Sequence, residues 1–234
     1  MSGDTTTPTA LVTGAGRRIG LFLVETLLRQ GYSVVAHYHH SHTELANLQR
    51  TGAELSIVQA DLTTAAGLTE VCAAIPAGVS LDLLINNAST FYRRDIADIT
   101  RDDYLDFYHI HVAVPALLVQ HLRPNLNSSS TGTVINLLDA RDGHFRGGFT
   151  PYALSRLAAR ELTRLQASEP GATLRVYGLA LERLLPDDPD SGAVGFQEPL
   201  TAEDRKKSLG SLQKGLMQLL TGQLPSGEIL TVNS

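Results

Sequence analysis

Residues 11–20 of the chain read LVTGAGRRIG, a glycine-rich turn that passes from a short apolar strand directly into an amphipathic helix. The glycines Gly14, Gly16 and Gly20 allow a tight turn and a close approach of the backbone to a pyrophosphate group. The amino end of the following helix adds unpaired N–H groups and the positive end of the helix dipole. The position of this turn between the first strand and the first helix favours a dinucleotide site over a plain structural turn.

Outward from this turn, short apolar segments alternate with longer segments of helical period. Gly31 is expected to end the first helix. Such alternation predicts right-handed βαβ units and an α/β fold: a doubly wound parallel sheet of about seven strands with helices on both faces. The strands are expected at 10–13, 33–37, 54–60, 81–86, 133–138, 174–179 and 228–232, and helices at 19–29, 102–122, 152–166 and 202–220.

No internal repeat or interdomain linker interrupts the pattern, so residues 1–234 are expected to form a single domain. The polar segment 125–132 is interpreted as a loop between a helix and a strand. Segment 185–200, rich in Pro, Gly and Asp, is also predicted to be a loop. It is either a lid over the ligand site or a tolerated surface insertion.

Composition excludes several classes of function. The chain is 43% hydrophobic and 18% charged, with a formal net charge of −5, which argues against nucleic acid or an anionic membrane as partner. A single cysteine, Cys72, makes an internal disulfide impossible and is expected to pack on an apolar helix face. No signal sequence or spanning apolar run is recognised, so a cytoplasmic protein is expected.

The end of the second strand indicates which nicotinamide cofactor is used. An NAD site usually has an acidic residue there, whereas this chain has HYHHSH at 37–42 and its first carboxylate at Glu44. Arg17 supplies positive charge for a 2′-phosphate, with His39, His40 and Ser41 as donors. NADPH is therefore predicted. No metal site is expected, because no carboxylate or thiol accompanies the histidines at ligand spacing.

Four motifs together resemble the short-chain dehydrogenase/reductase family. They are TGAGRRIG at 13–20, Asp61 after the third strand, NNA at 86–88 after the fourth strand, and Tyr152 at the start of a helix. The resemblance implies a Rossmann fold in which Tyr152 exchanges the proton that accompanies hydride transfer. It also implies that the basic residue four positions later, here Arg156, holds the nicotinamide ribose. A cation at that spacing lies on the same helix face and favours the ionised phenol.

Within that family the chain is most similar to pteridine reductases and dihydromonapterin reductases. Arg18 replaces the usual middle glycine, HYHHS at 37–41 resembles their cofactor segment, and NNASTFY at 86–92 resembles their NNASSFY. Asp139 precedes Tyr152 by thirteen residues, where most of the family has serine. His111, in IHV at 110–112, replaces the usual helix asparagine and matches dihydromonapterin reductases.

The resemblance implies a complete set of site residues. The catalytic residues are Asp139, Tyr152 and Arg156. Residues implied for the cofactor are Gly14, Gly16, Arg17, Arg18, Ile19, Gly20, His39, His40, Ser41, Asp61, Leu62, Asn87, Ala88, Tyr152 and Arg156. Residues implied for the pterin or folate substrate are Arg18, Ser89, Phe91, Asp139 and Tyr152. An aromatic face such as Phe91 suits a flat pterin ring, and Asp139 with Tyr152 forms a coupled acid.

Each assignment has a purely structural alternative. Asp139 would then cap a loop, and Tyr152 would begin a core helix with its hydroxyl in water. Phe91 alone is more often a core residue than a stacking platform. His111 is more often a satisfied helix histidine than a proton relay, and it is placed behind the residues that contact the ligands.

Two departures from the family pattern keep other functions open. Arg156 replaces lysine, which alters the head group and its proton chemistry. Residues 180–183, ALER, replace the Pro-Gly or Pro-Ser turn after the sixth strand. The predicted function is an NADPH-dependent dihydropterin or dihydrofolate reductase. The alternatives are a non-catalytic relative that acts as a sensor or partner subunit, and a carbonyl reductase for 3-oxoacyl thioesters or quinones.

The resemblance also implies a homotetramer formed through helices 102–122 and 152–166 and an edge strand. Val112, Val114, Leu117 and Leu118 are apolar enough for such an interface, although a monomer core would look the same.

Overall fold

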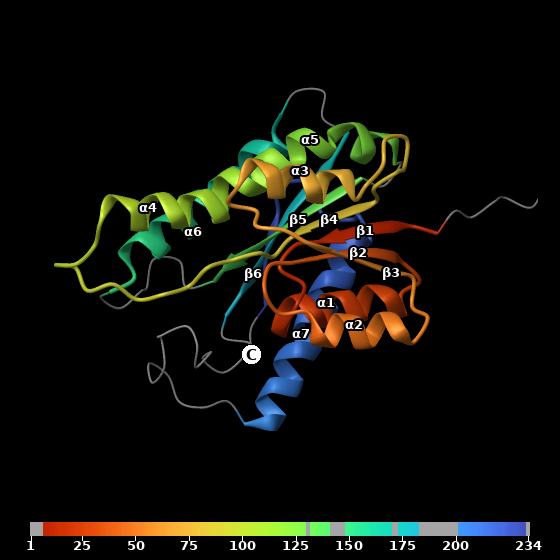
Figure 1. The fold of residues 1–234 in the computed structure, drawn as a ribbon, viewed down its shortest axis with the longest axis horizontal. Coiled ribbons are helices and arrows are strands. Elements are labelled where there is room, and N and C mark those ends of the chain that lie inside the picture. Colours follow the sequence, from red (N-terminus) through yellow and green to blue (C-terminus); the bar gives the residue numbers. More distant parts are fainter. Residues whose placement is uncertain (1–6, 130–131, 141–147, 170–172, 183–200, 233–234) are drawn as a thin grey trace, which may run out of the picture.

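A computed structural model describes residues 7–129, 132–140, 148–169, 173–182 and 201–232. Seven parallel strands form one sheet in the order β3-β2-β1-β4-β5-β6-β7 (Figure 1). The chain reverses its direction of winding between β1 and β4, which confirms the doubly wound sheet. The strands are β1 (Thr9–Val12), β2 (Ser33–Tyr38), β3 (Leu55–Gln59), β4 (Leu83–Asn86), β5 (Thr133–Asp139), β6 (Arg175–Leu181) and β7 (Ile229–Val232).

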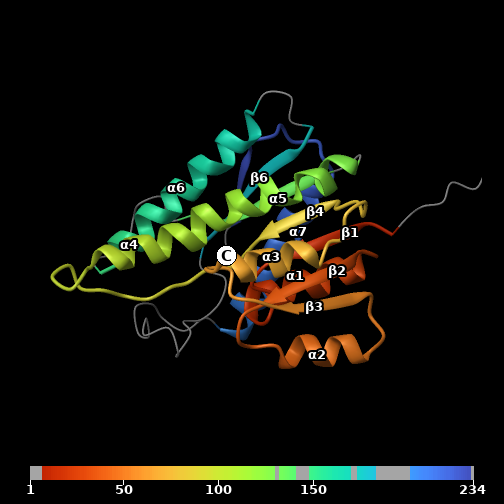
Figure 2. The ribbon, with the colours of Figure 1, turned by 45° about the horizontal axis from the view of Figure 1, so that its top comes forward.

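Helices cover both faces of the sheet, as Figures 1 and 2 show. On one face lie α1, α2 and α7; on the other lie α3, α5 and α6. The helical elements are α1 (Arg18–Arg29), α2 (Thr43–Arg50), α3 (Ala65–Ala73), α4 (Arg101–Tyr108), the π-helical segment η1 (His109–Ala113), α5 (Val114–Ser128), α6 (Thr150–Ala167) and α7 (Ala202–Leu220). The expected helices α1, α6 and α7 are confirmed to within two residues of their bounds.

Two apolar cores, one on each face, hold these layers together. Leu23 and Leu27 of α1 pack with Leu216 of α7 against the first face, and all three are inaccessible to solvent. Leu118 of α5 and Val71 of α3 pack against the second face. Strands buried on both faces are continuously apolar, which is why their sequences do not alternate.

The predicted helix 102–122 is wrong in two respects. It begins at Arg101 and is interrupted by the π-helical segment His109–Ala113, which a uniform period of 3.6 residues cannot reveal. It then continues through Pro124 to Ser128, so half of the loop expected at 125–132 is helical. Asn125 anchors the extended part of the helix to the segment before β4, because its buried side-chain amide donates to the carbonyl oxygens of Pro76 and Val79.

Strand ends and short helices differ from the expectation as well. No helix was predicted at α2 or α3, which are short, with 8 and 9 residues. The strand expected at 174–179 runs on to Leu181 as β6, paired with Asp139 of β5 and Val232 of β7. This extension occurs where the family turn is replaced, since neither Pro nor Gly stands at 180 or 181. Gly31 follows α1 with φ +81°, as predicted for a helix stop.

Several apolar residues proposed for an interface lie in the monomer core. Val112, Val114 and Leu118 are at most 8% exposed, and Leu117 is partly buried against the second core, which contains Val114 and Leu118. Cys72 also packs against that cluster. Segment 185–200, predicted as a lid or an insertion, lies outside the described residues. No helix in the described part of the chain has the length and apolar character needed to cross a membrane.

Candidate active site

The glycine-rich turn after β1 is built on close approaches of the backbone. Gly14 has φ +64°, and a Cβ atom there would lie 2.8 Å from Cα of Ala88. A Cβ on Gly16 would lie 1.8 Å from the carbonyl oxygen of Ser41, and one on Gly20 would lie 2.2 Å from that of Gly14. A side chain at any of these three positions would therefore push neighbouring backbone atoms out of place. This explains why all three residues are glycines.

Two polar side chains hold this turn in place. The backbone N–H of Gly14 donates to Nδ1 of His37 over 3.1 Å, so Nε2 of His37 carries the proton that it donates to the carbonyl of Ala60. Burial lowers the pKa of His37, which keeps the ring neutral. The side-chain amide of Asn87 donates to the carbonyls of Thr13 and Gly14, both at 2.9 Å. Asn87 thus fixes the turn itself, a role that the sequence assignment to the cofactor did not include.

The amino end of α1 has the properties of an anion site. Its N-cap residue, Arg17, makes no capping hydrogen bond through its side chain, and its first turn contains no acidic residue. Arg17 and Arg18 are both exposed at this end, and Ile19 is partly buried against the first core. This end of α1 thus combines a tight glycine turn, the N–H groups of a helix start and two arginines. These features fit the diphosphate of a nicotinamide dinucleotide.

The residues expected around the adenosine part lie at the ends of β2 and β3. His39, His40 and Ser41 are exposed, and the rings of His39 and His40 stack at 3.7 Å between centroids. Asp61 accepts hydrogen bonds from the backbone N–H and hydroxyl of Thr63, and these bonds lower the pKa of its carboxyl group. The Leu62 side chain is buried in the second core, which leaves only its main chain for contact with a ligand.

Asp139 and Tyr152 meet at the carboxyl end of the sheet. Asp139 is the last residue of β5, and Tyr152 is in the first turn of α6. The Tyr152 hydroxyl donates to Oδ2 of Asp139 over 3.1 Å. The separation of thirteen positions thus brings the two side chains into hydrogen-bond contact, and Tyr152 is buried rather than directed into water as in the structural alternative.

Arg156 lies one helical turn after Tyr152 and on the same side of α6. Its Nη2 donates to the carbonyl of Leu137 over 2.9 Å, and its guanidinium carbon lies 5.8 Å from the centre of the Tyr152 ring. Its Nε is buried without a hydrogen-bond partner among the described residues. The strand carbonyl therefore orients a fixed cation beside the tyrosine, with one donor group still unsatisfied.

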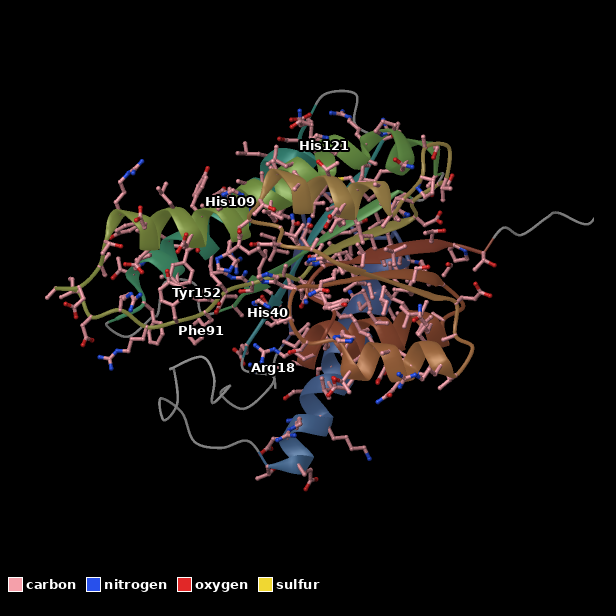
Figure 3. The ribbon with its side chains drawn as sticks, viewed as in Figure 1. Arg18, His40, Phe91, His109, His121 and Tyr152 are labelled. Atoms are coloured by element: carbon pink, nitrogen blue, oxygen red, sulfur yellow. The ribbon has the colours of Figure 1, made fainter. Side chains whose placement is uncertain are left out.

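Aromatic rings surround Tyr152 on the side of the loop that follows β4. The Phe91 ring stacks on Phe149 with 5.2 Å between centroids and meets the edge of Tyr152 at 4.8 Å. Figure 3 shows Phe91 beside Tyr152 at the same end of the sheet as Arg18 and His40. Phe91 is half-buried in this cluster rather than in either main core. The structure thus brings together the aromatic, acidic and basic residues that the sequence singled out.

His111 and Ser155 form a contact that the sequence analysis did not foresee. His111 lies in the π-helical segment, is 3% exposed and bridges the hydroxyls of Ser89 and Ser155 at 2.8 Å each. Ser155 was not considered for the site. Its position three residues after Tyr152 places it on the same helix face, and this spacing is the signal that could have found it.

The departure at 180–183 changes the end of β6. Ala180 is fully buried, and the carbonyl of Leu181 accepts from the N–H of Ala140 at 3.0 Å. The backbone N–H of Glu182 donates to Val232 at 3.2 Å, and Arg183 lies outside the described residues. Pairing of β6 with β5 and β7 therefore continues to Glu182, at the position where the family has a Pro-Gly or Pro-Ser turn.

The chain is similar in sequence or in fold to several known proteins. The chain is 28% identical to pteridine reductase 1 of Leishmania tarentolae, over 80% of this chain and 81% of that protein. It is also 28% identical to gluconate 5-dehydrogenase of Gluconobacter oxydans (strain 621H), over 76% of this chain and 75% of that protein. A solved structure of FolM alternative dihydrofolate reductase 1 from Brucella canis complexed with NADP shares the fold with a TM-score of 0.78. Its identity is 23%, over 97% of this chain and 92% of that one.

The family model of the short chain dehydrogenases matches residues 8–182, which include the glycine turn, Asn87, Asp139 and Tyr152. The relatives carry the names of enzymes with different substrates, so the comparisons leave the substrate of this chain open. The chain belongs to the short-chain dehydrogenase family of oxidoreductases.

Proposed function

We propose that this protein is an NADPH-dependent reductase of dihydropterins, with dihydrofolate as a further substrate. The observation that carries the proposal is the hydrogen bond between the Tyr152 hydroxyl and the Asp139 carboxylate, next to the Phe91 ring. Reduction of a ring C=N bond needs a hydride on carbon and a proton on nitrogen. Tyr152 and Asp139 together hold a proton at one place as a coupled acid.

The cofactor is proposed to be NADPH. A reduced nicotinamide supplies the hydride when it is bound. Arg17 at the start of α1 offers positive charge for a 2′-phosphate, and His39, His40 and Ser41 at the end of β2 offer donors. The relative solved with NADP supports this choice.

Each residue of the site has a defined task in the proposed reaction. Arg156, held by the carbonyl of Leu137, keeps a positive charge beside the phenol and supplies donors to a ribose. Tyr152 delivers its hydroxyl proton to the substrate nitrogen, and the Asp139 carboxylate then takes up a proton from solvent and passes it to the phenolate oxygen of Tyr152. Phe91 offers an aromatic face to the flat pteridine ring. Ser89 and Arg18 contact its polar edge.

A carbonyl reductase needs no second acid beside the tyrosine, because a single proton donor serves a ketone oxygen. The carboxylate of Asp139 in hydrogen-bond contact with Tyr152 therefore favours the pteridine substrate over a 3-oxoacyl thioester or a quinone. The similarity to pteridine reductase 1 of Leishmania tarentolae supports the same choice.

The test is NADPH oxidation at 340 nm with dihydromonapterin, dihydrobiopterin and dihydrofolate, repeated with NADH. We expect turnover of at least one dihydropterin with NADPH and slower turnover with NADH. The variant Tyr152→Phe should lose about 100-fold or more of kcat, in line with the loss of a general acid. Its NADPH affinity, measured by fluorescence titration, should remain close to that of the unmodified protein.

Asp139→Asn tests the second member of the acid pair, because it keeps a hydrogen-bonding side chain at the end of β5 and removes the carboxyl group. It should lower dihydropterin reduction strongly. Tight NADPH binding without turnover of any dihydropterin would instead favour the sensor or partner-subunit alternative. Faster turnover of a 3-oxoacyl thioester or quinone would favour the carbonyl reductase.

A further inference from the structure

A buried histidine connects the proposed substrate-binding loop to the catalytic helix. Nε2 of His111 lies 2.8 Å from the hydroxyl oxygen of Ser89, and Nδ1 lies 2.8 Å from that of Ser155. Ser89 stands in the loop after β4, His111 in η1 and Ser155 in α6. The π-helical geometry of η1 displaces the register of the helix, a feature common at functional sites.

The direction of the bond on the Ser155 side follows from proton counting. The Ser155 hydroxyl lies 2.7 Å from the backbone carbonyl oxygen of Tyr152, which can only accept. The single hydroxyl proton of Ser155 therefore lies on that bond. Ser155 must then accept from His111, so Nδ1 of His111 carries a proton.

The direction on the Ser89 side follows from the neutral state of His111. The ring is 3% exposed, stands among Phe107 and Tyr152, and lies near the positive charge of Arg156. Burial lowers the pKa of His111 far below its ordinary value, and Arg156 lowers it further. With Nδ1 protonated, Nε2 is an acceptor, and the Ser89 hydroxyl donates to it.

This bond uses the only proton of the Ser89 hydroxyl. Among the described residues, the carbonyl of Thr90 is the other acceptor of the Ser89 hydroxyl, but it is farther away, at 3.2 Å. Two acceptor atoms 2.8 Å apart with no proton between them would repel each other, so the proton belongs to the shorter contact. The exposed Ser89 oxygen thus presents lone pairs and no donor to a ligand.

We propose that His111, as its Nδ1–H tautomer, fixes the Ser89 hydroxyl as a hydrogen-bond acceptor toward the substrate, so that the site selects rings that present an N–H group there. The inference rests on the proposed function for the place of Ser89 beside the substrate. His111 is a positioning residue, because it acts through Ser89. A 2-amino-4-oxopteridine edge carries such N–H donors, whereas an acceptor atom facing Ser89 is disfavoured.

The first test reads the tautomer directly in the cofactor-free protein. With ¹⁵N-labelled histidine, two-bond ¹H–¹⁵N correlation spectra distinguish a protonated Nδ1 from a protonated Nε2 in a neutral ring. The His111→Asn spectrum assigns the signal by its disappearance. We expect a neutral His111 with the proton on Nδ1 at pH 7. A proton on Nε2, or a charged ring, overturns the inference.

The second test compares two ligands by calorimetric titration of the NADP⁺-saturated protein: 7,8-dihydropterin and its 2-dimethylamino analogue, which lacks the amino donors. The unmodified protein should bind the amino form about 10-fold more tightly, the value of one hydrogen bond. His111→Asn keeps a donor for Ser155 but does not reach Ser89, so most of this preference should be lost. Ser89→Ala should lose it equally, and the double variant no more than either.

A merely structural role for His111 would weaken both ligands alike and leave their ratio unchanged, and that result overturns the inference. Equal binding of the two ligands by the unmodified protein overturns it too, as does no binding of either. Dihydropterin turnover is measured separately with NADPH. Turnover with an unchanged ratio leaves the proposed function standing without the inference. A ratio that falls in both variants without turnover supports the inference and removes the proposed function.

Discussion

Arg18 carries an unusual backbone conformation at the point where cofactor and substrate are proposed to meet. Its φ of +54° makes it the one non-glycine residue with a positive φ among the residues that the structure describes. That region is costly for a residue with a Cβ atom, which explains why most of the family has glycine there. A strained residue kept in such a site is expected to serve the ligand rather than stability.

Substitution Arg18→Gly should therefore separate stability from binding. Relief of the left-handed strain is expected to raise the free energy of unfolding by about 1 kcal/mol, which corresponds to a thermal midpoint about 2–4 °C higher. Loss of the guanidinium should weaken NADPH binding about 10-fold. Differential scanning fluorimetry without cofactor and a fluorescence titration measure the two effects.

Arg18→Ala is the matched control, because it removes the same charge and keeps the strain. It should lose the same NADPH affinity without the gain in thermal midpoint. Equal midpoints for the glycine and alanine variants would show that the conformation at residue 18 is not a source of strain.

At the scale of the elements, His37 joins three parts of the dinucleotide side of the sheet. It lies on β2, accepts from Gly14 in the turn before α1 and donates to Ala60 after β3. The bond from Gly14 needs the neutral ring, since a protonated Nδ1 cannot accept it, whereas Nε2 donates to Ala60 in either charge state. The geometry of the cofactor turn thus depends on the charge state of one buried side chain in the neighbouring strand.

Stability is expected to fall on mild acidification for this reason. The pKa of His37 is lower in the folded protein than its ordinary value of 6.5, so the unfolded chain binds the proton more readily. The stabilisation is complete above pH 6.5 and declines below it, toward the folded pKa. Each such histidine contributes a slope of at most about 1.4 kcal/mol per pH unit.

Urea unfolding between pH 7.5 and 5 measures this slope. His37→Asn offers an acceptor that does not titrate and should flatten the profile, while His111 maintains part of the slope. Asp61 and Asp103 have pKa values below the ordinary 3.8 and change charge at more acidic pH. An unchanged slope in His37→Asn would contradict the assigned role of His37.

At the scale of the whole molecule, the neighbouring helices α4 and α6 carry exposed apolar side chains. Leu105 and Tyr108 of α4 are 48% and 52% exposed, and Leu154 and Leu157 of α6 are 52% and 40% exposed. The two helices pack against each other, so these side chains come from neighbouring elements. Exposed apolar groups of this kind commonly mark an interface. They replace Val112, Val114 and Leu118, which fill the core, as the candidate contacts of a homotetramer.

We therefore expect sedimentation velocity to report a tetramer of the 25.2 kDa chain. The double substitution Leu105→Glu and Leu154→Glu should dissociate it into smaller species, because charges would be buried against apolar surface. Val79→Glu, at a residue of similar exposure before β4, is the control and should keep the assembly. A monomer in the unmodified protein would remove the tetramer proposal.

The sequence alone determined the seven strands and the helices α1, α6 and α7, because each of them carries its own local pattern, whereas α2 and α3 were not predicted. The glycine turn needed no tertiary information either, since strand, glycines and helix are contiguous. The spacing of Tyr152 and Arg156 placed both on one helix face for the same reason. Asp139 was identified through a resemblance to a family. Its contact with Tyr152 arises because the carboxyl end of β5 and the amino end of α6 lie next to each other in space.

The tertiary structure alone decided the features that depend on contacts between distant segments. The π-helical segment cannot be recognised in the sequence, because one wider turn within a long helix leaves the spacing of apolar residues almost unchanged. Leu118 and Leu154 are equally apolar, and only packing buries the first and exposes the second. His111 meets Ser89 and Ser155 because the loop after β4, η1 and α6 converge. Periodicity reports which side of an element is apolar, whereas the partner of a polar side chain is set by the packing of whole elements.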